Sequence, residues 1–437
     1  MKYLTVIYFD TFARFFHAIE DEVKDTDPNA EFLHLSIFPS GWAYLKTRRR
    51  KTRLLPLELL KPNTTHIDVS VADLRTISNY HAVVGAHSGR ANDAALRRRS
   101  QRYVDTIARI IDNFRPDVVL LSGDTRIACE AMRYHLKASH FPGPVFYFEQ
   151  GPNGTTMLDR QGVNANASFR FLAAELTGQG YEPEAARKLA KYKRNPIYRA
   201  TDYAVIALLR VFGKLPPEWD TMRLGSYPEY GYAELTTAPI LEAPVPGEVL
   251  VALQVPDDAN NIHHNPLKLN DHGLLQWVLT ATESLGWRVR VREHPLYKRK
   301  YSAELYDLLG ATDRAILSAQ SLADDLSAAN AVVTINSTTG LDAYLQSKPV
   351  VVLGNAYYDH LPGIRRAADQ QQLTDALDVA AAKGGFADSD LDPRKVFAEL
   401  KARYLLPGHY QDADLTTPAL IARELVAAGE AAARDDR

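Results

Sequence analysis

Residues 331–340 read AVVTINSTTG, and they determine how the rest of the chain is interpreted. The run 331–335 is short, apolar and rich in β-branched residues, which predicts a buried strand of a parallel sheet. A helix is predicted over 339–346, and polar residues connect it to the strand: Asn336, Ser337, Thr338 and Thr339. Hydroxyl groups and unpaired backbone N–H groups at the start of a helix bind anions, so these residues are predicted to bind a phosphate group. Plain capping of the helix by Ser337 or Thr338 is the alternative.

Short β-branched runs alternate with helical stretches on both sides of this segment, which predicts α/β domains with parallel sheets. In the second half we expect strands at 248–254, 288–292, 315–317 and 350–353 and helices at 270–285 and 322–328. In the first half we expect strands at 3–9, 31–35, 81–84, 118–122 and 145–148, a long helix at 92–113 and a largely helical stretch at 167–225. The tail, 415–437, is predicted to be a helix with a charged end.

A chain of 437 residues is too long for one hydrophobic core. Prolines and a glycine concentrate between residues 236 and 247, which is typical of a linker. We therefore expect two Rossmann-like domains facing across a cleft. The predicted ranges are 1–238 for the acceptor-side domain, 239–247 for the linker, 248–410 for the nucleotide-binding domain and 411–437 for a C-terminal helix and tail.

Composition and charge exclude several classes of protein. The net charge of −2 gives no overall attraction to nucleic acid, and a single cysteine, Cys129, cannot form an internal disulfide. No signal peptide and no apolar run of membrane-spanning length is recognised, so a cytoplasmic location is expected. Two basic runs, 48–53 and 97–99, are interpreted either as solvated surface or as contacts with anionic lipid or a phosphorylated acceptor, which would place the protein at the periphery of the inner membrane.

The segment RVRVREHP, residues 288–295, is the second candidate phosphate site. Arg292 and His294 are two residues apart at the end of a predicted strand, so they share one face. A histidine there is expected to donate to a phosphate oxygen or to protonate a departing phosphate, while Arg292 balances negative charge. A purely structural histidine is the alternative.

The segment QVPDD places two carboxylates after the strand that ends near Gln254. Asp257 and Asp258 are adjacent, so one of them is expected to face the ligand as a nucleophile, a base or a metal ligand. The alternative is a turn that favours Pro-Asp for local reasons.

The first half contributes polar residues at three predicted strand ends. Glu149 ends an aromatic strand and is interpreted as a general base or a sugar ligand, with a structural ion pair as the alternative. Further predicted donor- or acceptor-binding residues lie in the turns after these strands: Arg14, Thr125, Asn153 and Asn164.

Several catalytic motifs are missing from the sequence. Neither a P-loop nor a Rossmann glycine fingerprint occurs, which argues against ATP hydrolysis and NAD chemistry. A Gly-x-Ser-x-Gly elbow and an Asp-x-Asp motif are also absent, and no structural metal spacing is found.

Taken together, four segments resemble the capsule polysaccharide biosynthesis family of bacterial retaining β-Kdo glycosyltransferases. The matching segments, in chain order, are Phe148-Glu149-Gln150-Gly151, Gln254-Val255-Pro256-Asp257-Asp258, Arg292-Glu293-His294-Pro295 and Thr334-Ile335-Asn336-Ser337-Thr338-Thr339-Gly340. The resemblance implies a GT-B-like fold, CMP-β-Kdo as donor and a glycan or glycolipid acceptor of capsule or lipopolysaccharide. It further implies double displacement with retention of configuration, Asp258 or its neighbour Asp257 as nucleophile, Glu149 near the sugar or acceptor, and His294 helping CMP to leave.

No metal or other cofactor is expected, because Arg292, His294 and a helix dipole are able to neutralise the departing phosphate. Two alternatives are retained. One keeps the enzyme class with another donor: CMP-sialic acid, CDP-glycerol or a UDP-sugar. The other is a non-catalytic protein that binds polysaccharide or is associated with its export.

Overall fold

A computed structural model describes residues 1–87, 89, 92–184, 190–211, 219, 246–386 and 391–435. The chain forms two compact units. Unit 1 contains residues 1–163, 186–223 and 404–437, and unit 2 contains residues 164–185 and 224–403. The chain therefore passes between the units more than once. A single division at the linker assigns residues 164–185 to the first domain and 404–410 to the second, whereas they lie in unit 2 and unit 1, respectively. Most of the linker predicted at 239–247 lies outside the described residues.

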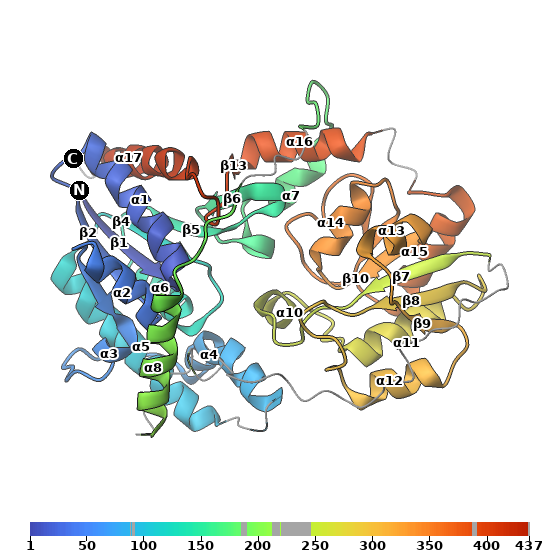
Figure 1. Ribbon diagram of the computed structural model, residues 1–437, viewed down its shortest axis with the longest axis horizontal. Coiled ribbons are helices and arrows are strands. Elements are labelled where there is room, and N and C mark those ends of the chain that lie inside the picture. Colours follow the sequence, from blue (N-terminus) through green and yellow to red (C-terminus); the bar gives the residue numbers. More distant parts are fainter. Residues whose placement is uncertain are drawn as a thin grey trace. The chain divides into compact units, whose positions relative to one another are not determined.

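Unit 1 is built on a seven-stranded sheet in the order β13-β6-β5-β4-β1-β2-β3 (Figure 1). Its strands are β1 (Lys2–Ile7), β2 (Glu31–Ser36), β3 (Thr52–Leu54), β4 (Val118–Ser122), β5 (Val145–Gln150), β6 (Thr155–Asp159) and β13 (Leu405–Pro407). The five strands from β3 to β5 are parallel, whereas β6 and β13 are added antiparallel at one edge. The parallel part has the Rossmann order 3-2-1-4-5, with the switch between β1 and β4.

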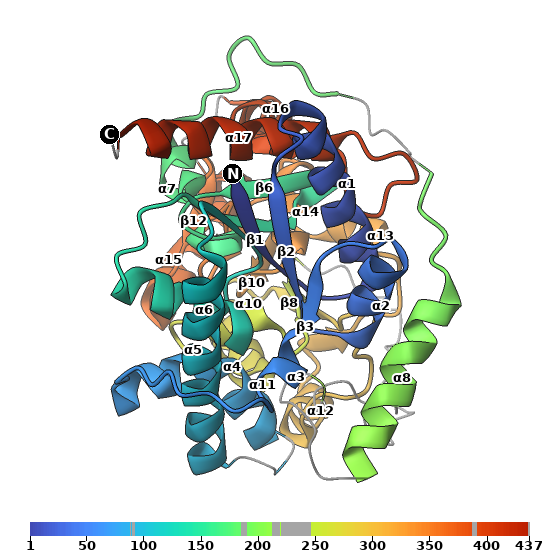
Figure 2. The same cartoon turned by 90° about the vertical axis from the view of Figure 1, so that its left-hand side faces the viewer.

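Helices cover both faces of this sheet, as Figure 2 shows. One face carries α1 (Asp10–Thr26), α2 (Pro39–Thr47) and α17 (Thr417–Asp435), and the other carries α4 (Val71–His87), α5 (Asp93–Phe114) and α6 (Ile127–Ala138). The short helices of this unit are α3 (Leu55–Glu58) and η1 (Pro152–Gly154), and α8 (Pro196–Val211) packs against α2. Apolar residues of α1 and α17 pack against the buried face of the strands, so the C-terminal helix belongs to this core.

Unit 2 has a six-stranded, fully parallel sheet in the order β9-β8-β7-β10-β11-β12. Its strands are β7 (Glu248–Ala252), β8 (Arg288–Arg292), β9 (Ala315–Leu317), β10 (Ala331–Thr334), β11 (Val350–Val352) and β12 (Ile364–Arg366). Counted along the chain this is 3-2-1-4-5-6, the full Rossmann order. Each of the two units is therefore Rossmann-like, which confirms the predicted α/β, GT-B-like fold class.

The helices of unit 2 also lie on both faces of its sheet. Those that share the main apolar core with β7 and β8 are α11 (Asp271–Ala281), α12 (Ala303–Gly310) and α15 (Gln370–Lys383). Those that contact β7, β10 and β11 from outside this core are α13 (Leu322–Ala328) and α14 (Thr338–Tyr344). The remaining helices are η2 (Asn164–Asn166), α7 (Phe169–Leu172), η3 (Ala173–Glu175), α10 (Ala259–His263) and α16 (Pro393–Tyr404), whose last residue already belongs to unit 1.

One predicted strand is wrong: residues 81–84 lie inside α4. The buried positions of that helix include Leu74, Ile77 and His81, which repeat at helical spacing and place the short apolar run at the end of a longer amphipathic pattern. The stretch 167–225 is helical only in part, in α7, η3 and α8, and most of 212–225 lies outside the described residues.

Candidate functional site

Most of the predicted site residues lie at the carboxyl ends of three neighbouring strands of unit 2. The strands β10, β7 and β8 are adjacent, and successive connections leave the sheet on opposite faces at β7 and β10. In open α/β sheets a ligand binds outside the strand ends at this switch point. Gln254 to Asp258 follow β7, Arg292 ends β8 with Glu293 and His294 after it, and Asn336 to Thr339 follow β10. The structure therefore brings these predicted segments to one edge.

Gln254 and Asn336 join the two strands at the switch point. Asn336 Oδ1 accepts a hydrogen bond from Gln254 Nε2 at 2.7 Å, and the backbone N–H of Asn336 donates to Gln254 Oε1 at 3.0 Å. Asn336 Nδ2 also donates to the carbonyl oxygens of Asn260 at 3.0 Å and His264 at 3.3 Å. The side chain of Asn336 is buried and its polar atoms are engaged, so it positions the β7–α11 loop instead of presenting a free amide to phosphate.

Asp258 is exposed at the start of α10. Its Oδ1 accepts a hydrogen bond from the backbone N–H of Asn260 at 2.8 Å, so the residue is the N-cap of this short helix. The neighbouring Asp257 is partly exposed. The capping bond fixes the direction of the Asp258 side chain and occupies one of its two carboxylate oxygens.

His294 is held by two hydrogen bonds just beyond β8. Its backbone N–H donates to the hydroxyl of Tyr301 at 3.0 Å, and its Nδ1 accepts from the backbone N–H of Leu296 at 3.2 Å. Because Nδ1 is an acceptor, the neutral ring carries its proton on Nε2. Burial lowers the pKa of His294 below its usual 6.5, and the nearby carboxylate of Asp258 opposes this shift. At neutral pH the residue therefore presents a neutral N–H donor, in the electrostatic field of Asp258.

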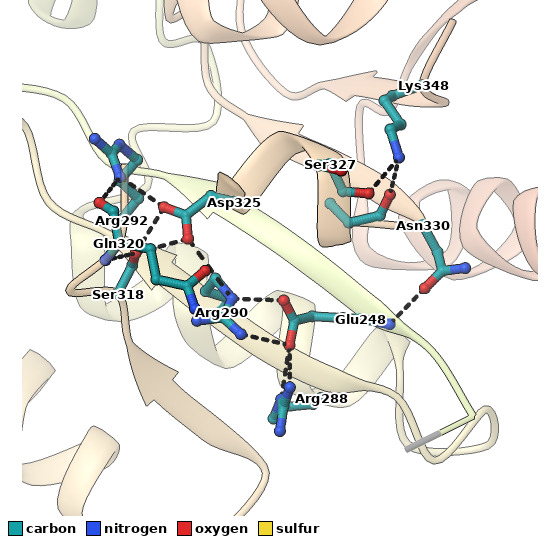
Figure 3. A network of polar contacts seen from close by, with 11 residues as sticks. Glu248, Arg288, Arg290, Arg292, Ser318, Gln320, Asp325, Ser327, Asn330 and Lys348 are labelled. Carbon is teal, nitrogen blue, oxygen red and sulfur yellow. Dashed lines mark hydrogen bonds and ion pairs between the residues drawn. The ribbon is translucent and has the colours of Figure 1, made fainter. Parts of the chain in front are cut away.

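Arg292 is oriented by a network of buried charges, shown in Figure 3. Its Nη1 donates to Asp325 Oδ2 at 2.6 Å and to the carbonyl oxygen of Gln320 at 2.9 Å. Asp325 is fully buried on α13 and also accepts from the hydroxyl of Ser318. Arg292 thus reaches the strand end as one half of an ion pair, and only part of its guanidinium group is available to a ligand.

The same network runs back along the strand (Figure 3). Arg288 and Arg290 both donate to the buried carboxylate of Glu248, and Arg290 lies 3.7 Å from Asp325. Three guanidinium groups therefore face two carboxylates, which leaves one net positive charge on this side of β8. A positive excess beside the strand end favours the binding of an anion.

The Ser337–Thr339 turn is a tight cap of α14. Ser337 Oγ accepts from the backbone N–H of Thr339 at 3.2 Å, and the hydroxyl of Tyr358 donates to the carbonyl oxygen of Ser337. Gly340 is required here, since a Cβ atom at this position would lie 2.5 Å from the Tyr358 hydroxyl oxygen. Thr338 is exposed at the turn. The capping role that the sequence left open for Ser337 is therefore present, and Thr338 holds the exposed hydroxyl group.

The predicted residues of the first half divide between the two units. Glu149 is the penultimate residue of β5 in unit 1. A Cβ atom on Gly123 would lie 3.9 Å from Glu149 Oε2, so the β4 and β5 turns adjoin. Thr125 is partly exposed in the β4 turn, and Asn153 is exposed in η1 with a positive φ of 51°. Asn164, with a φ of 53°, belongs to unit 2.

Arg14 has a structural set of contacts. Its guanidinium group donates to the carbonyl oxygens of Asp412, at 2.8 Å, and Ala413, and it lies over the ring of Tyr192. It therefore ties α1 to the loop that precedes α17, which differs from the predicted contact with donor or acceptor.

Two charged groups near the strand ends were missed by the sequence reasoning. Arg170 is buried and forms a bidentate pair with Asp359, to which it donates from Nε at 2.9 Å. Its partner lies 189 residues away, so no local pattern could reveal the pair. Glu130 is buried on α6, where burial, assisted by Asp124 and opposed by Arg133, raises its pKa to about 7. Its only sequence signal is a carboxylate on the apolar face of a helix.

Within the described residues, no helix is long and apolar enough to cross a membrane.

Comparison with known proteins finds similarity to one protein family over part of the chain. Residues 234–384 match the profile of the family described as "Capsule polysaccharide biosynthesis protein". Protein FixF of Sinorhizobium fredii (strain NBRC 101917 / NGR234) is 31% identical over 172 residues, which are 38% of this chain and 40% of that protein. The chain thus spans less than half the length of this curated relative.

Similar solved structures include UDP-GlcNAc 2-epimerase from Neisseria meningitidis bound to UDP-GlcNAc, with 10% identity, a TM-score of 0.35 and coverage of 98% of this chain and 100% of that one. Another is the β-Kdo 2,7 transferase KpsC from Thermosulfurimonas dismutans, with 18% identity, a TM-score of 0.34 and coverage of 77% and 98%.

Proposed function

We propose that the protein is a retaining glycosyltransferase that moves β-Kdo from CMP-β-Kdo to a glycan or glycolipid acceptor of bacterial surface polysaccharide. The match of residues 234–384 to the capsule polysaccharide biosynthesis family supports this proposal. One observation carries the proposal most directly. A carboxylate loop, a neutral histidine donor and a hydroxyl-bearing turn follow three adjacent strands at the switch point of a Rossmann-like unit. This is the set of groups that displacement of a phosphate from a sugar requires.

The leaving group in this proposal is the phosphate of CMP, bound at the carboxyl edge of unit 2. The net positive charge of the Arg288–Arg292 network offsets the charge that develops when the bond to the sugar breaks. His294 donates its Nε2 proton in a hydrogen bond to a phosphate oxygen, and Thr338 and the N–H groups of its turn supply further donors. CMP leaves as a monophosphate, so we expect no metal to be needed.

The proposed nucleophile is Asp258. In the first step its carboxylate oxygen attacks the anomeric carbon, the bond from that carbon to the phosphate oxygen breaks, and the electron pair leaves with CMP. In the second step the acceptor hydroxyl oxygen attacks the same carbon, and the electron pair of the ester bond returns to Asp258. Two inversions retain the configuration. The capping bond to Asn260 orients the side chain and leaves Oδ2 as the attacking oxygen.

Glu149 is the proposed base that accepts the proton of the acceptor hydroxyl in the second step. We further propose that Gln254, Asp257, Thr125, Asn153 and Asn164 contact the donor or the acceptor. For Asn336 and Arg14 the hydrogen bonds support a positioning role instead.

A panel of CMP, UMP, UDP and CDP tested by thermal unfolding examines the donor. A ligand at one hundred times its Kd adds about 2.7 kcal/mol, which raises the unfolding midpoint of a domain of this size by roughly 5–10 °C. We expect the largest shift with CMP, and CMP release from CMP-Kdo that persists in EDTA. A larger shift with UDP or CDP would favour another donor, and no shift with any nucleotide would favour a non-catalytic binding protein.

A further inference from the structure

The helix α8 (Pro196–Val211) packs against α2 in unit 1 (Figure 2), and its buried residues are Asp202 and Ile206. Asp202 is fully buried, and its Oδ1 accepts a hydrogen bond from the backbone N–H of Ser40 in α2 at 2.7 Å. Its Oδ2 accepts from Arg199 Nη1 at 3.1 Å. The side of α8 that packs on unit 1 thus combines a buried carboxylate with a single buried apolar side chain, Ile206.

The opposite side of α8 is an exposed apolar stripe. Four large side chains share it, with exposed fractions of 68%, 40%, 58% and 82%: Ile197, Tyr203, Leu208 and Val211. The residues between them on this side are exposed alanines at helical spacing: Ala200, Ala204 and Ala207. Seven apolar residues over four helical turns form one continuous strip, whereas exposed hydrophobic residues of a globular protein are usually scattered.

Basic residues border this stripe. Residues 191–211 contain five lysines and arginines and one aspartate, the buried Asp202, so the segment has a net charge of +4. Within it, Arg194 is paired with the buried Asp10 and Arg199 with Asp202. Lys193 and Arg210 are exposed near its two ends. The neighbouring stretch 39–54 contains no acidic residue.

The neighbouring helix α2 contributes both charge and an aromatic ring. Arg48 donates to the hydroxyl of Tyr198 in α8 at 3.0 Å, which places the first basic run beside the stripe. Lys46 and Arg49 are exposed in the same turn, and Trp42 on α2 is 37% exposed. The second basic run lies on α5, on the other face of the sheet, and is not part of this surface.

We propose that α8 and the adjoining end of α2 form a surface that binds an anionic lipid bilayer, with α8 lying in the plane of the interface. An apolar stripe that includes a tyrosine and is flanked by lysine and arginine, with an exposed tryptophan on the neighbouring helix, is typical of such surfaces. At about 1.5 Å per residue the helix is too short to span a bilayer, so it lies along the surface. A second copy of the chain fits less well, because a two-fold interface would bring the same basic residues together.

This surface extends the proposed function, since it would bring the enzyme to acceptors carried by lipid, but its test needs no enzymatic activity. The full chain is mixed with vesicles of phosphatidylglycerol and phosphatidylethanolamine, or of phosphatidylcholine alone, and the bound fraction is measured by flotation. We expect binding to the anionic vesicles only, weakened by added salt. No binding to anionic vesicles, or equal binding to both kinds, would overturn the proposal.

Variants distinguish binding through this surface from non-specific adsorption to vesicles. Leu208→Gln combined with Val211→Gln is expected to lower the partition coefficient about tenfold or more, since both lose apolar contact with lipid. Lys193→Gln and Arg210→Gln are each expected to lower it about fivefold at low salt. Leu60→Gln is the matched control, because Leu60 is an exposed leucine of unit 1 outside this surface, 47% exposed.

Two further outcomes would also count against the lipid surface. The first is a control variant that loses as much binding as the α8 variants. The second is a wild-type dimer in light scattering that becomes a monomer when Leu208 and Val211 are changed. CMP release with a water-soluble acceptor is measured in parallel, and it should be the same in the α8 variants and the wild type. An α8 variant that loses vesicle binding but retains CMP release shows that the lipid surface and the proposed reaction can fail independently.

Discussion

Replacement of Asn336 by alanine tests whether the hydrogen bonds of its side chain at the switch point support the proposed nucleotide site. The substitution removes three side-chain hydrogen bonds: the one accepted from Gln254 and the two donated to the carbonyl oxygens of Asn260 and His264. The backbone bond from residue 336 to Gln254 remains. The variant therefore keeps both strands and one hydrogen bond to the Gln254 side chain, but it releases the loop that carries Asp258.

The expected magnitude follows from these bonds. At about 1 kcal/mol for each net hydrogen bond, the loss is about 3 kcal/mol, and the midpoint of a domain of 150–250 residues should fall by roughly 6–12 °C. Asn330→Ala is the matched control. Asn330 lies at the amino end of β10, and its Oδ1 accepts one bond, from the backbone N–H of Glu248 at 2.8 Å. Its loss should cost about 1 kcal/mol.

Thermal unfolding, CMP binding and hydrogen exchange distinguish the two variants. We expect Asn336→Ala to unfold at the lower temperature, to exchange the amides of residues 253–264 faster and to bind CMP at least about tenfold more weakly, as a displaced binding loop implies. Asn330→Ala should bind CMP like the wild type. Equal decreases in the unfolding midpoint, or equal CMP affinities in the two variants, would refute the reasoning that the side chain of Asn336 positions the site.

Three further predictions concern ionisable groups. Asp258→Asn should abolish CMP release from the donor while Asp257→Asn, its neighbouring control, retains part of it; equal losses would contradict the choice of nucleophile. Burial raises the pKa of Glu130 from 4.5 to about 7, so its stabilising contribution is complete below about pH 4.5 and is lost as the pH rises to about 7. Glu130→Gln should remove that slope, worth up to about 3 kcal/mol, in unfolding measured against pH, and a variant with the wild-type slope would contradict the shift. Burial lowers the pKa of His294 below 6.5, so the unfolded chain binds the proton more readily and wild-type stability should decline as the pH falls below 6.5. His294→Gln should weaken that decline in the same measurement, and an unchanged decline would assign it to other groups.

The sheet of unit 2 was predictable because its strands are fully buried. A strand covered on both faces needs a continuous apolar run, and Val249, Val251, Val332 and Val351 belong to such runs. Short edge strands carry a weaker signal. The strand β13 has three residues and joins the sheet of unit 1 through antiparallel pairing with β6, about 250 residues earlier in the chain. Pairing over that separation leaves no periodic pattern in the sequence.

The positions of the candidate site residues were also predictable, because the carboxyl ends of parallel strands share one edge. Their hydrogen-bond partners were not. Asn336 was expected to face a phosphate group, yet its amide bonds to two carbonyl oxygens of the β7–α11 loop. Arg14 was expected near a substrate, yet it donates to a loop some 400 residues further along the chain. An amide or guanidinium group has several donors, and the sequence does not show which hydrogen-bond acceptors these donors find in the folded protein.

The arrangement of β8 explains how a cation is kept at the ligand edge of unit 2. Alternation along a strand puts Arg288, Arg290 and Arg292 on one face, where three unpaired charges would repel each other and resist burial. Glu248 and Asp325 stabilise this face by pairing with the arginines. Two carboxylates leave one positive charge unbalanced, and the pairing with Asp325 holds Arg292 at the strand end. The charge that a phosphate ligand would meet is therefore oriented before the ligand binds. A preorganised charge needs little rearrangement when negative charge develops on a leaving group, which is the physical requirement of the proposed reaction.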